Sequence, residues 1–159
     1  MSHGALRYAQ TMSNTPNQKH RRAQRTSAFI QVLIERYPDC FSTERAKIRP
    51  LAIGIEKAIR ASLDADNADE PTPSWLIRQA LARYTRSPAY LESIIAGTER
   101  IDLDGKIVEP VTEAAIEQAK TQRNEQKSRA AERRRVHAEA AAEQKRREKL
   151  EQLAERFNQ

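Results

Sequence analysis

Positive charge gathers at the two ends of this 159-residue chain, and this segregation limits how much of the chain can fold. Residues 1–25 have a net charge of +5, residues 26–119 a net charge of −4, and residues 120–149 a net charge of +6. Apolar residues at helical spacing occur mainly in the middle segment. We therefore predict one compact domain, residues 26–120, between a disordered basic arm (1–25) and a basic tail (121–159) that is either a lone helix or disordered.

The spacing of apolar and helix-capping residues predicts four helices in the first part of the domain. The first is expected to begin at Thr26 or Ser27, which are good N-caps, and the second to span about 55–63. Thr72-Pro73 and Ser87-Pro88 each combine an N-cap residue with proline at the first helical position, which predicts the starts of the third and fourth helices. The side chains expected in the core are Phe29, Ile30, Leu33, Ile34, Tyr37, Ile55, Ile59, Leu63, Leu76, Ile77, Ala80, Leu81, Tyr84, either Tyr90 or Leu91, Ile94 and Ile95.

A small β-hairpin is predicted over residues 100–109. Apolar and polar residues alternate there, and Asp104-Gly105 suits the two positive-φ positions of a type I′ turn. Thr112 is expected to cap a final helix, and residues 64–70 are expected to form an acidic surface loop. The predicted fold class is therefore mostly α with a small β-hairpin (α+β).

The predicted domain offers no constellation of residues for catalysis or metal binding. The three histidines lie in the arm or the tail, outside the predicted domain. The sequence has only four glycines and contains no Gly-rich phosphate loop. Asp102 and Asp104 are two residues apart on the hairpin, where the turn itself explains them. The single cysteine, Cys40, is expected to be a packed residue. We predict that the chain is not an enzyme and needs no cofactor or metal ion.

The cationic ends indicate a nucleic-acid partner, because each phosphate that Lys or Arg neutralises releases a condensed counterion. An anionic membrane is the weaker candidate. Residues 120–149 carry mostly alanine where a membrane-binding helix needs large apolar residues. The sequence also has no run of 18 apolar residues, so we predict a cytoplasmic protein without a membrane span.

Three arginines are predicted to share one exposed face of the third helix. Arg78, Arg83 and Arg86 fall within an arc of about 140° opposite the apolar stripe. A planar guanidinium can bind two phosphate oxygens at once. The residues alone leave two interpretations open: a phosphate-binding face, or a solvated face paired with Asp or Glu.

Three ordered stretches of the middle segment carry a more specific signal. They are residues 49–55 (RPLAIGI), residues 76–91 (LIRQALARYTRSPAYL) and residues 97–106 (GTERIDLDGK). In order and spacing they resemble the signature motifs of the FinO/ProQ family of bacterial RNA chaperones, over residues 26–120. The resemblance implies a small, mostly helical domain that recognises the base of an RNA hairpin stem together with its single-stranded 3′ tail, as in intrinsic terminators. We expect the protein to act as a monomer.

The resemblance also assigns roles by position. Tyr90 and Arg100 match the family's pocket for the RNA 3′ end, Arg78 matches an RNA-contacting position on the third helix, and Arg49 begins the shared Arg-Pro-Leu stretch. Two alternatives stay open, since Tyr90 fits a plain core residue and Arg100 could pair with Glu99 or Glu109. The candidate RNA-binding residues are therefore Arg49, Arg78, Arg83, Arg86, Tyr90 and Arg100.

The chain departs from the family pattern at three positions. Family members commonly have lysine where this chain has Ala52, and often a basic residue where it has Ala82 or Ala89. Either Arg83 and Arg86 compensate from neighbouring positions, or the contact surface is shifted or binds more weakly.

The predicted function is an RNA chaperone that binds small RNAs and transcript 3′ ends, stabilises them and promotes RNA–RNA pairing in post-transcriptional regulation. One alternative is a ribosome-associated or scaffolding protein that uses the C-terminal helix as a spacer. The other is a DNA-binding regulator, which the third helix fits poorly because it is short and lacks Asn or extra Gln at base-reading spacing.

Overall fold

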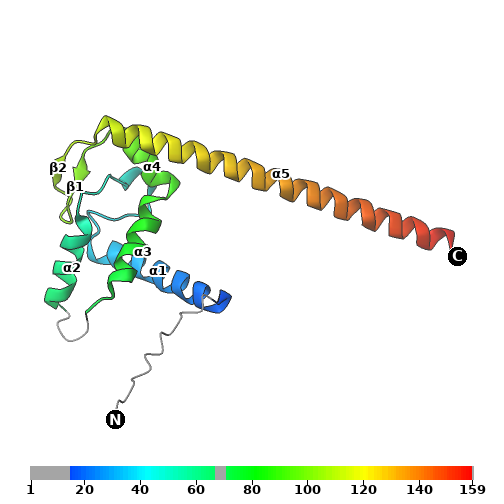
Figure 1. The fold of residues 1–159 in the computed structure, drawn as a ribbon, viewed down its shortest axis with the longest axis horizontal. Coiled ribbons are helices and arrows are strands. Elements are labelled where there is room, and N and C mark those ends of the chain that lie inside the picture. The colour runs from blue at the N-terminus through cyan, green and yellow to red at the C-terminus, as the bar shows by residue number, and fades with distance from the viewer. Residues whose placement is uncertain (1–14, 67–70, 159) are drawn as a thin grey trace, which may run out of the picture.

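The computed structural model describes residues 15–66 and 71–158 and shows five α-helices and a two-stranded hairpin among them (Figure 1). The elements are α1 (Pro16–Arg36), the short 3-10 helix η1 (Arg45–Lys47), α2 (Ile55–Asp66), α3 (Ser74–Thr85), α4 (Pro88–Ile95), β1 (Arg100–Ile101), β2 (Ile107–Glu109) and α5 (Glu113–Phe157). Helix α1 packs along α3, the first turns of α5 pack on α4, and both α1 and α5 extend past the domain on the same side (Figure 1). The predicted fold class, mostly α with a small β-hairpin, is confirmed.

A single apolar core joins the helices to the hairpin. Leu33 of α1, Ile59 of α2, Ile77 of α3 and Ile101 of β1 all have no more than 1% of their surface exposed. Removing this apolar surface from water is the main stabilising contribution to the fold. The predicted core positions Ile30, Ile34, Tyr37, Leu81 and Ile95 are partly buried, and the others are buried.

Helix α1 begins at Pro16, so the predicted start at Thr26 or Ser27 is wrong. Proline at the first helical position is the start signal that decides the boundary. The two expected caps instead bond backward inside the helix. The hydroxyl of Thr26 donates to the carbonyl oxygen of Arg22 (2.8 Å), and the hydroxyl of Ser27 donates to that of Ala23 (2.9 Å).

The predicted disordered arm is accordingly wrong for residues 16–25, which are helical. Thr15 occupies the cap position before the helix, and residues 1–14 lie outside the described residues. Helix α2 likewise runs to Asp66, past its predicted end at residue 63, so the first residues of the expected acidic loop are helical; residues 67–70 lie outside the described residues.

The two proline start signals differ in outcome. Ser87 caps α4 as predicted, because its hydroxyl accepts a hydrogen bond from the backbone N–H of Tyr90 (3.3 Å) and Pro88 is the first helical residue. Helix α3 begins at Ser74, so Thr72 is not its cap. Pro73 is itself extended, with ψ of 129°, and occupies the cap position.

The segment before α2 pairs with β1 and supports the candidate site. The backbone N–H of Ile101 donates to the carbonyl oxygen of Pro50 (2.9 Å), and that of Ala52 donates to the carbonyl oxygen of Ile101 (2.8 Å). These bonds place Leu51 in a parallel bridge with β1. The extended or turn element predicted here is therefore a short extension of the hairpin, and it fixes Leu51 beside α4.

The hairpin is present, but its turn is not the predicted type I′. Ile101 pairs with Ile107, so residues 102–106 form the loop, and Gly105 alone in that loop has a positive φ (+77°). The Asp102 carboxylate accepts hydrogen bonds from the backbone N–H groups of Asp104 and Lys106, both at 2.9 Å. Asp102 thus serves the turn, as predicted, and the described residues contain no cluster of metal-binding side chains.

The tail is helical as far as Phe157, in continuation of the domain's last helix. The Thr112 hydroxyl caps α5 as predicted by accepting from the backbone N–H of Ala115 (3.3 Å). From residue 131 onward every described residue is exposed, and ion pairs one turn apart, such as Arg147 with Glu143 (3.3 Å), support the helix there. Within the described chain, no helix combines the length and the apolar character that crossing a membrane requires.

Cys40 is buried and packed, as predicted. Burial, with a smaller contribution from the Asp102 charge, raises the pKa of its thiol to about 12. Because only the thiolate is nucleophilic, about one molecule in ten thousand is reactive at pH 8. We expect iodoacetamide to leave Cys40 unmodified in the folded protein and to label it fully in urea, as measured by intact mass. Rapid labelling of the folded protein would contradict this packing.

Candidate nucleic-acid interface

Tyr90 and Arg100, which lie ten positions apart in the sequence, meet at the peptide groups of Leu51. The Tyr90 hydroxyl accepts a hydrogen bond from the Leu51 N–H (2.9 Å), and the Arg100 guanidinium donates to the Leu51 carbonyl oxygen (2.9 Å). The Arg100 side chain is largely buried, and its Nε lies 4.0 Å from a carboxylate oxygen of Glu109. The structure therefore brings the two predicted pocket residues together. Glu109, the other partner considered for Arg100, lies at the limit of ion-pair distance.

Tyr90 is both a core residue and a potential donor. It is 6% exposed and packs edge-on against Tyr84, with ring centroids 5.8 Å apart. Burial raises the pKa of the Tyr90 hydroxyl above its ordinary value, although the Leu51 N–H and the Arg100 charge oppose that shift. The hydroxyl therefore stays protonated at neutral pH, and its proton is available for donation to a ligand.

A cavity of about 260 Å³ lies beside this pair, where the ends of α3 and α4 meet the first turns of α5. It contains three of the six candidate residues: Arg86 at the end of α3, Tyr90 of α4 and Arg100 of β1. The remaining lining residues are Thr85, Leu91, Ile94, Ala115, Gln118, Ala119 and Gln122. The lining offers two arginines, a phenol and two amides beside apolar side chains, so it presents several groups that can hydrogen-bond to a small polar ligand. The residues of α5 in this lining were not predicted from the sequence.

The arginine face of α3 is exposed, and no carboxylate among the described residues forms an ion pair with Arg78, Arg83 or Arg86. Arg83 instead donates to the hydroxyl of Ser27 (2.8 Å) and the carbonyl oxygen of Ala23 (3.4 Å), both on α1. This arrangement disfavours the interpretation of a face paired with Asp or Glu.

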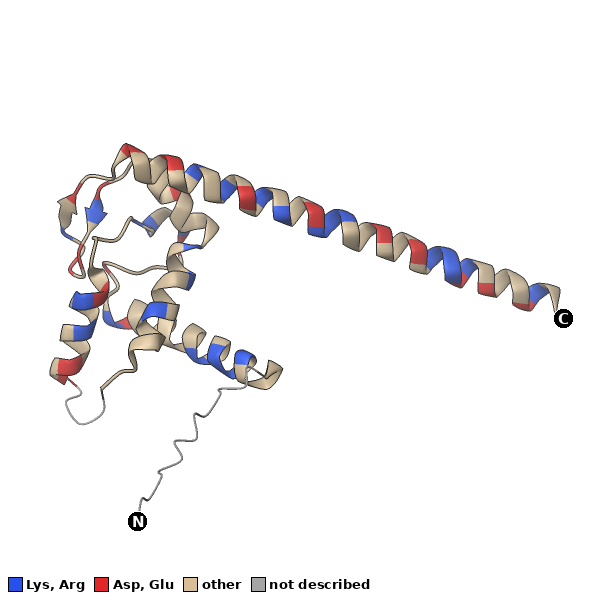
Figure 2. Ribbon diagram, viewed as in Figure 1, with Lys and Arg blue, Asp and Glu red and all other residues tan. Residues whose placement is uncertain are grey.

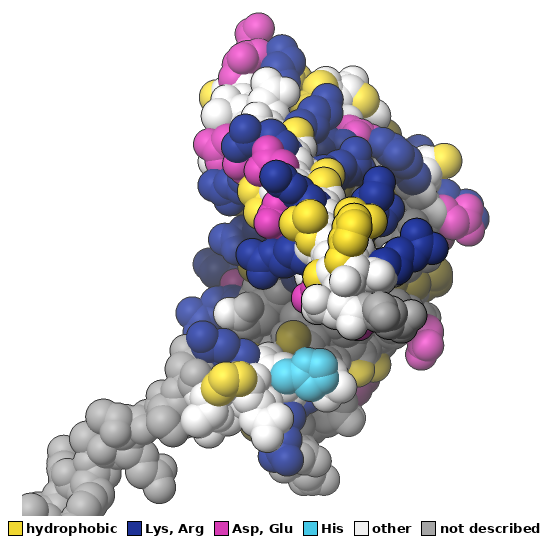
Figure 3. All heavy atoms as spheres, turned by 90° about the vertical axis from the view of Figure 1, so that its right-hand side faces the viewer, with side chains coloured by type: hydrophobic (Ala, Val, Ile, Leu, Met, Phe, Trp, Pro, Cys, Tyr) yellow, Lys and Arg dark blue, Asp and Glu magenta, His cyan; other side chains and the backbone are white. Residues whose placement is uncertain are grey.

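The six candidates do not form one cluster. Arg86 lines the cavity, and Arg83 faces α1. Arg78 and Arg49 are exposed, and they lie neither in the cavity nor on the surface between α1 and α3. Figure 2 shows blue, basic segments along α1 without red ones until its last turn, and Figure 3 shows Lys and Arg side chains over much of the face toward which α1 and α5 extend.

The three departures from the family pattern have different surroundings. Ala52 is half-buried beside β1, and Ala89 is half-buried against the core. Ala82 faces α1, next to Arg83 and Arg86. Its small side chain leaves space on the α3 surface where a longer basic side chain would lie.

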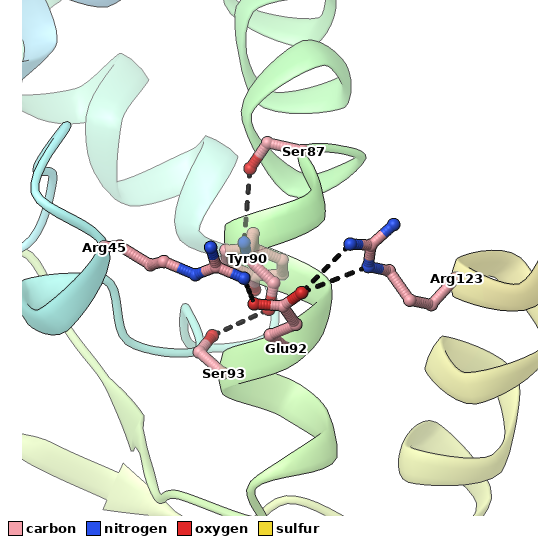
Figure 4. Close-up of polar contacts among 6 residues, drawn as sticks. All are labelled: Arg45, Ser87, Tyr90, Glu92, Ser93 and Arg123. Carbon is pink, nitrogen blue, oxygen red and sulfur yellow. Dashed lines mark hydrogen bonds and ion pairs between the residues drawn. The ribbon is translucent and has the colours of Figure 1, made fainter. Parts of the chain in front are cut away.

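Glu92 joins α5 to the domain beside the cavity, a role that sequence reasoning missed (Figure 4). Its carboxylate lies between two arginines: Arg123 of α5 donates from Nε (3.2 Å) and Nη2 (3.0 Å), and Arg45 of η1 forms an ion pair from the other side. These hydrogen bonds hold the pKa of the Glu92 carboxyl below its ordinary value. One carboxylate of α4 thus links both η1 and α5 to the domain.

Replacing Glu92 with glutamine is expected to loosen the first turns of α5. Because the folded-state pKa of Glu92 is lowered, its contribution to stability is present at neutral pH and is lost as the pH falls below 4.5 through that lowered pKa. Amide exchange near Arg123 should therefore be faster in Glu92→Gln than in the wild type at pH 7. The unfolding temperatures of the two proteins should differ at pH 7 and converge in acid. A constant difference across that pH range would contradict the proposed role of the charge.

The small helical domain with its short hairpin and cationic face is the architecture of a known family. The model of the ProQ/FINO family matches residues 23–136, and the chain belongs to that family. This confirms the resemblance predicted from the three motifs.

Curated relatives and a solved structure agree with this assignment. The chain is 38% identical over 113 residues to a protein named RNA chaperone ProQ from Idiomarina loihiensis, covering 71% of this chain and 52% of that protein. It is 39% identical over 120 residues to a protein of the same name from Alteromonas mediterranea, covering 76% of this chain and 51% of that one. The solution structure of a ProQ homolog from Legionella pneumophila matches with a TM-score of 0.52 and 27% identity, over 79% of this chain and 91% of that one. The chain thus spans about half the length of these curated relatives.

Proposed function

We propose that this chain is a non-enzymatic RNA chaperone of the bacterial cytoplasm that binds, as a monomer, the base of a hairpin stem and its single-stranded 3′ tail. The observation that carries the proposal is the cavity in which Arg86, Tyr90 and Arg100 meet. The curated relatives named RNA chaperone ProQ support the same class of activity.

The cavity suits the last nucleotide of an RNA strand. Its volume of about 260 Å³ lies just below the range of about 300–1,000 Å³ that is typical of small-ligand sites, so a group as small as a terminal ribose suits it. The protonated Tyr90 hydroxyl can donate to a ribose oxygen, and the guanidinium of Arg86 or Arg100 can bind the phosphate that precedes it. A free 3′ hydroxyl is therefore the end that this site favours.

The exposed arginines suit the stem. The major groove of A-form RNA is too deep and narrow for side chains, so a protein contacts mainly phosphates and 2′-hydroxyls. Arg78 and Arg83 on α3 and the basic turns of α1 offer guanidinium and ammonium groups at the surface for such contacts. Contacts of this kind read the shape of the RNA rather than its sequence, and they weaken as salt concentration rises.

A chaperone must also bring a second strand near the first. Helix α5 presents eleven basic and five acidic residues between positions 120 and 149, on a rod that extends from the RNA-binding domain. Such a helix can attract a complementary strand without a fixed binding pose, which fits the promotion of pairing.

The test is a titration with a terminator hairpin that carries a uridine tail, the same hairpin without its tail, and a DNA hairpin of the same sequence. We expect the tailed RNA to bind at least tenfold more tightly than either control at physiological salt, and to pair faster with a complementary RNA when protein is present. Equal binding of all three would mean that charge alone drives association, and the proposal would fail. Preference for the DNA hairpin would favour the DNA-binding alternative.

A further inference from the structure

A second cavity lies between α1 and α3, on the surface where Ala82 leaves space. Its volume is about 750 Å³, well inside the range of ligand-binding sites. None of the described residues that line it is acidic. The lining residues are Lys19, Arg22, Ala23, Thr26, Trp75, Gln79, Ala82, Arg83 and Arg86, and we call this cavity the α1–α3 groove.

The groove exists because α1 begins at Pro16 and not at Thr26. Residues of α1 between Lys19 and Thr26 form one of its walls, and α3 with the following Arg86 forms the other. The hydrogen bonds from Arg83 to Ser27 and to Ala23 hold the two walls together. The groove therefore belongs to the folded domain and takes none of its lining residues from α5, although the side-chain amide of Gln126 on α5 donates to the carbonyl oxygen of Arg86 (2.7 Å).

An indole forms part of the apolar wall. Trp75, at the start of α3, is half-buried and packs against the core. Arg25 does not line the groove, but its guanidinium lies 5.3 Å from the centre of the Trp75 ring, where a cation–π interaction keeps the indole in place. Ala23 and Ala82 are the small apolar residues of the lining, and their short side chains leave room for a flat ring.

We propose that the α1–α3 groove binds an unpaired stretch of RNA, with a base against Trp75 and phosphates on Lys19, Arg83 and Arg86. Single-stranded nucleic acid is bound where aromatic side chains offer a stacking surface inside a cationic groove, which is the combination found here. A double helix does not fit the same description, because its bases are already stacked and cannot reach the indole.

Arg86 connects this groove to the cavity at Tyr90 and Arg100, since it lines both. A strand whose 3′ end occupies the smaller cavity has a cationic route across Arg86 into the groove. The inference rests on the proposed RNA-binding function and extends it, because it assigns a second site to the single-stranded part of the RNA.

The experiment uses the intrinsic fluorescence of Trp75, which is the only tryptophan in the sequence. The probe is a single-stranded uridine oligonucleotide blocked by a 3′ phosphate, so that binding in the 3′-end cavity is disfavoured. We expect saturable quenching of Trp75 by this probe and none by a polyglutamate peptide of similar charge. Quenching by the peptide as strong as that by RNA would reduce the groove to a nonspecific anion site and overturn the proposal.

Two matched variants on α1 distinguish the groove from general charge. Ala23→Glu places a carboxylate in the groove, whereas Ala28→Glu makes the same substitution at an exposed position on the opposite side of α1. We expect Ala23→Glu to weaken oligonucleotide binding about tenfold and to remove the quenching, and Ala28→Glu to change affinity less than twofold. Equal losses in the two variants would overturn the assignment.

A third variant tests stacking itself. Trp75→Phe should bind a labelled oligonucleotide within about threefold of the wild type, and Trp75→Leu, which keeps apolar bulk, should lose about tenfold. If the wild type shows no quenching but still prefers a tailed terminator hairpin, the groove proposal fails and the proposed function stands. If neither RNA binds at physiological salt, the proposed function fails as well.

Discussion

Replacing Arg100 with alanine is expected to abolish the preference for an RNA with a free 3′ hydroxyl. Arg100 is one of the cationic groups of the 260 Å³ cavity, and its side chain is only 14% exposed. A hydrogen bond that involves a charged partner contributes about 1.5–3 kcal/mol, so we expect the affinity for a hairpin with a 3′ hydroxyl to fall roughly 10- to 150-fold. An RNA that ends in a phosphate should bind the variant and the wild type within about threefold of each other.

Two further variants separate the 3′ end from the rest of the RNA. Arg78→Ala removes an exposed arginine of α3 that does not line the cavity, so it should weaken the binding of both RNAs by similar factors. Tyr90→Phe should reduce the preference for the hydroxyl, since it removes the donor and keeps the ring in the core. A preference that survives in both Arg100→Ala and Tyr90→Phe would contradict the assignment of this cavity to the RNA end.

The stability of these variants must be measured as well, because both side chains hold Leu51. In the wild type the Leu51 N–H donates a hydrogen bond to the Tyr90 hydroxyl. Tyr90→Phe removes this acceptor, and we expect the unfolding free energy to fall by about 1–3 kcal/mol. Binding should therefore be compared well below the unfolding temperature of each variant. Arg100→Lys offers a control that keeps the charge but loses the planar fork.

Phe41→Ala is expected to produce the largest loss of stability. Phe41 is 1% exposed and packs edge-on against Tyr84, with ring centroids 5.1 Å apart. Truncating a buried phenylalanine costs about 3–5 kcal/mol, through lost burial and the cavity left behind. Urea unfolding followed by circular dichroism measures this change. Phe157→Ala is the matched control, because Phe157 is 87% exposed and should cost less than about 0.5 kcal/mol. Similar losses in the two variants would contradict the position of the core.

The start signals in the sequence predicted helix boundaries unevenly: Thr72-Pro73 did not define the start of α3, and the hydroxyls near the start of α1 were misleading. Ser87-Pro88 defined the start of α4 because both signals fell at one boundary. At α1 the hydroxyls of Thr26 and Ser27 suggested a cap, but helical backbone lets them bond to the preceding turn instead. The start signal at Pro16 is weak in the sequence, because the residues after it are basic and show no apolar period.

The hairpin turn shows how a side chain can override a favoured dipeptide. Asp104-Gly105 fits a type I′ turn, but the Asp102 carboxylate accepts from two backbone N–H groups and stabilises a longer loop in which Asp104 does not have a positive φ. A local pattern cannot reveal this choice, because it depends on the register of β1 against β2.

Much of the candidate site depends on contacts that are remote in the sequence. The motifs identified Tyr90 and Arg100, but not the Leu51 peptide between them, the wall supplied by α5, or the link from Glu92 to Arg123. The α1–α3 groove could not be predicted, because most of its α1 wall lies before the predicted helix start at Thr26 or Ser27. Whether the six candidate arginine and tyrosine positions contact RNA stays a prediction.

The most direct test of the account is one titration at physiological salt, with a single uridine-tailed terminator hairpin that ends in either a 3′ hydroxyl or a 3′ phosphate. The account predicts at least tenfold tighter binding of the hydroxyl form by the wild-type protein, with equal binding of the two forms by Arg100→Ala. Equal affinity of the wild type for both forms would contradict it and would assign the binding to the cationic surface alone.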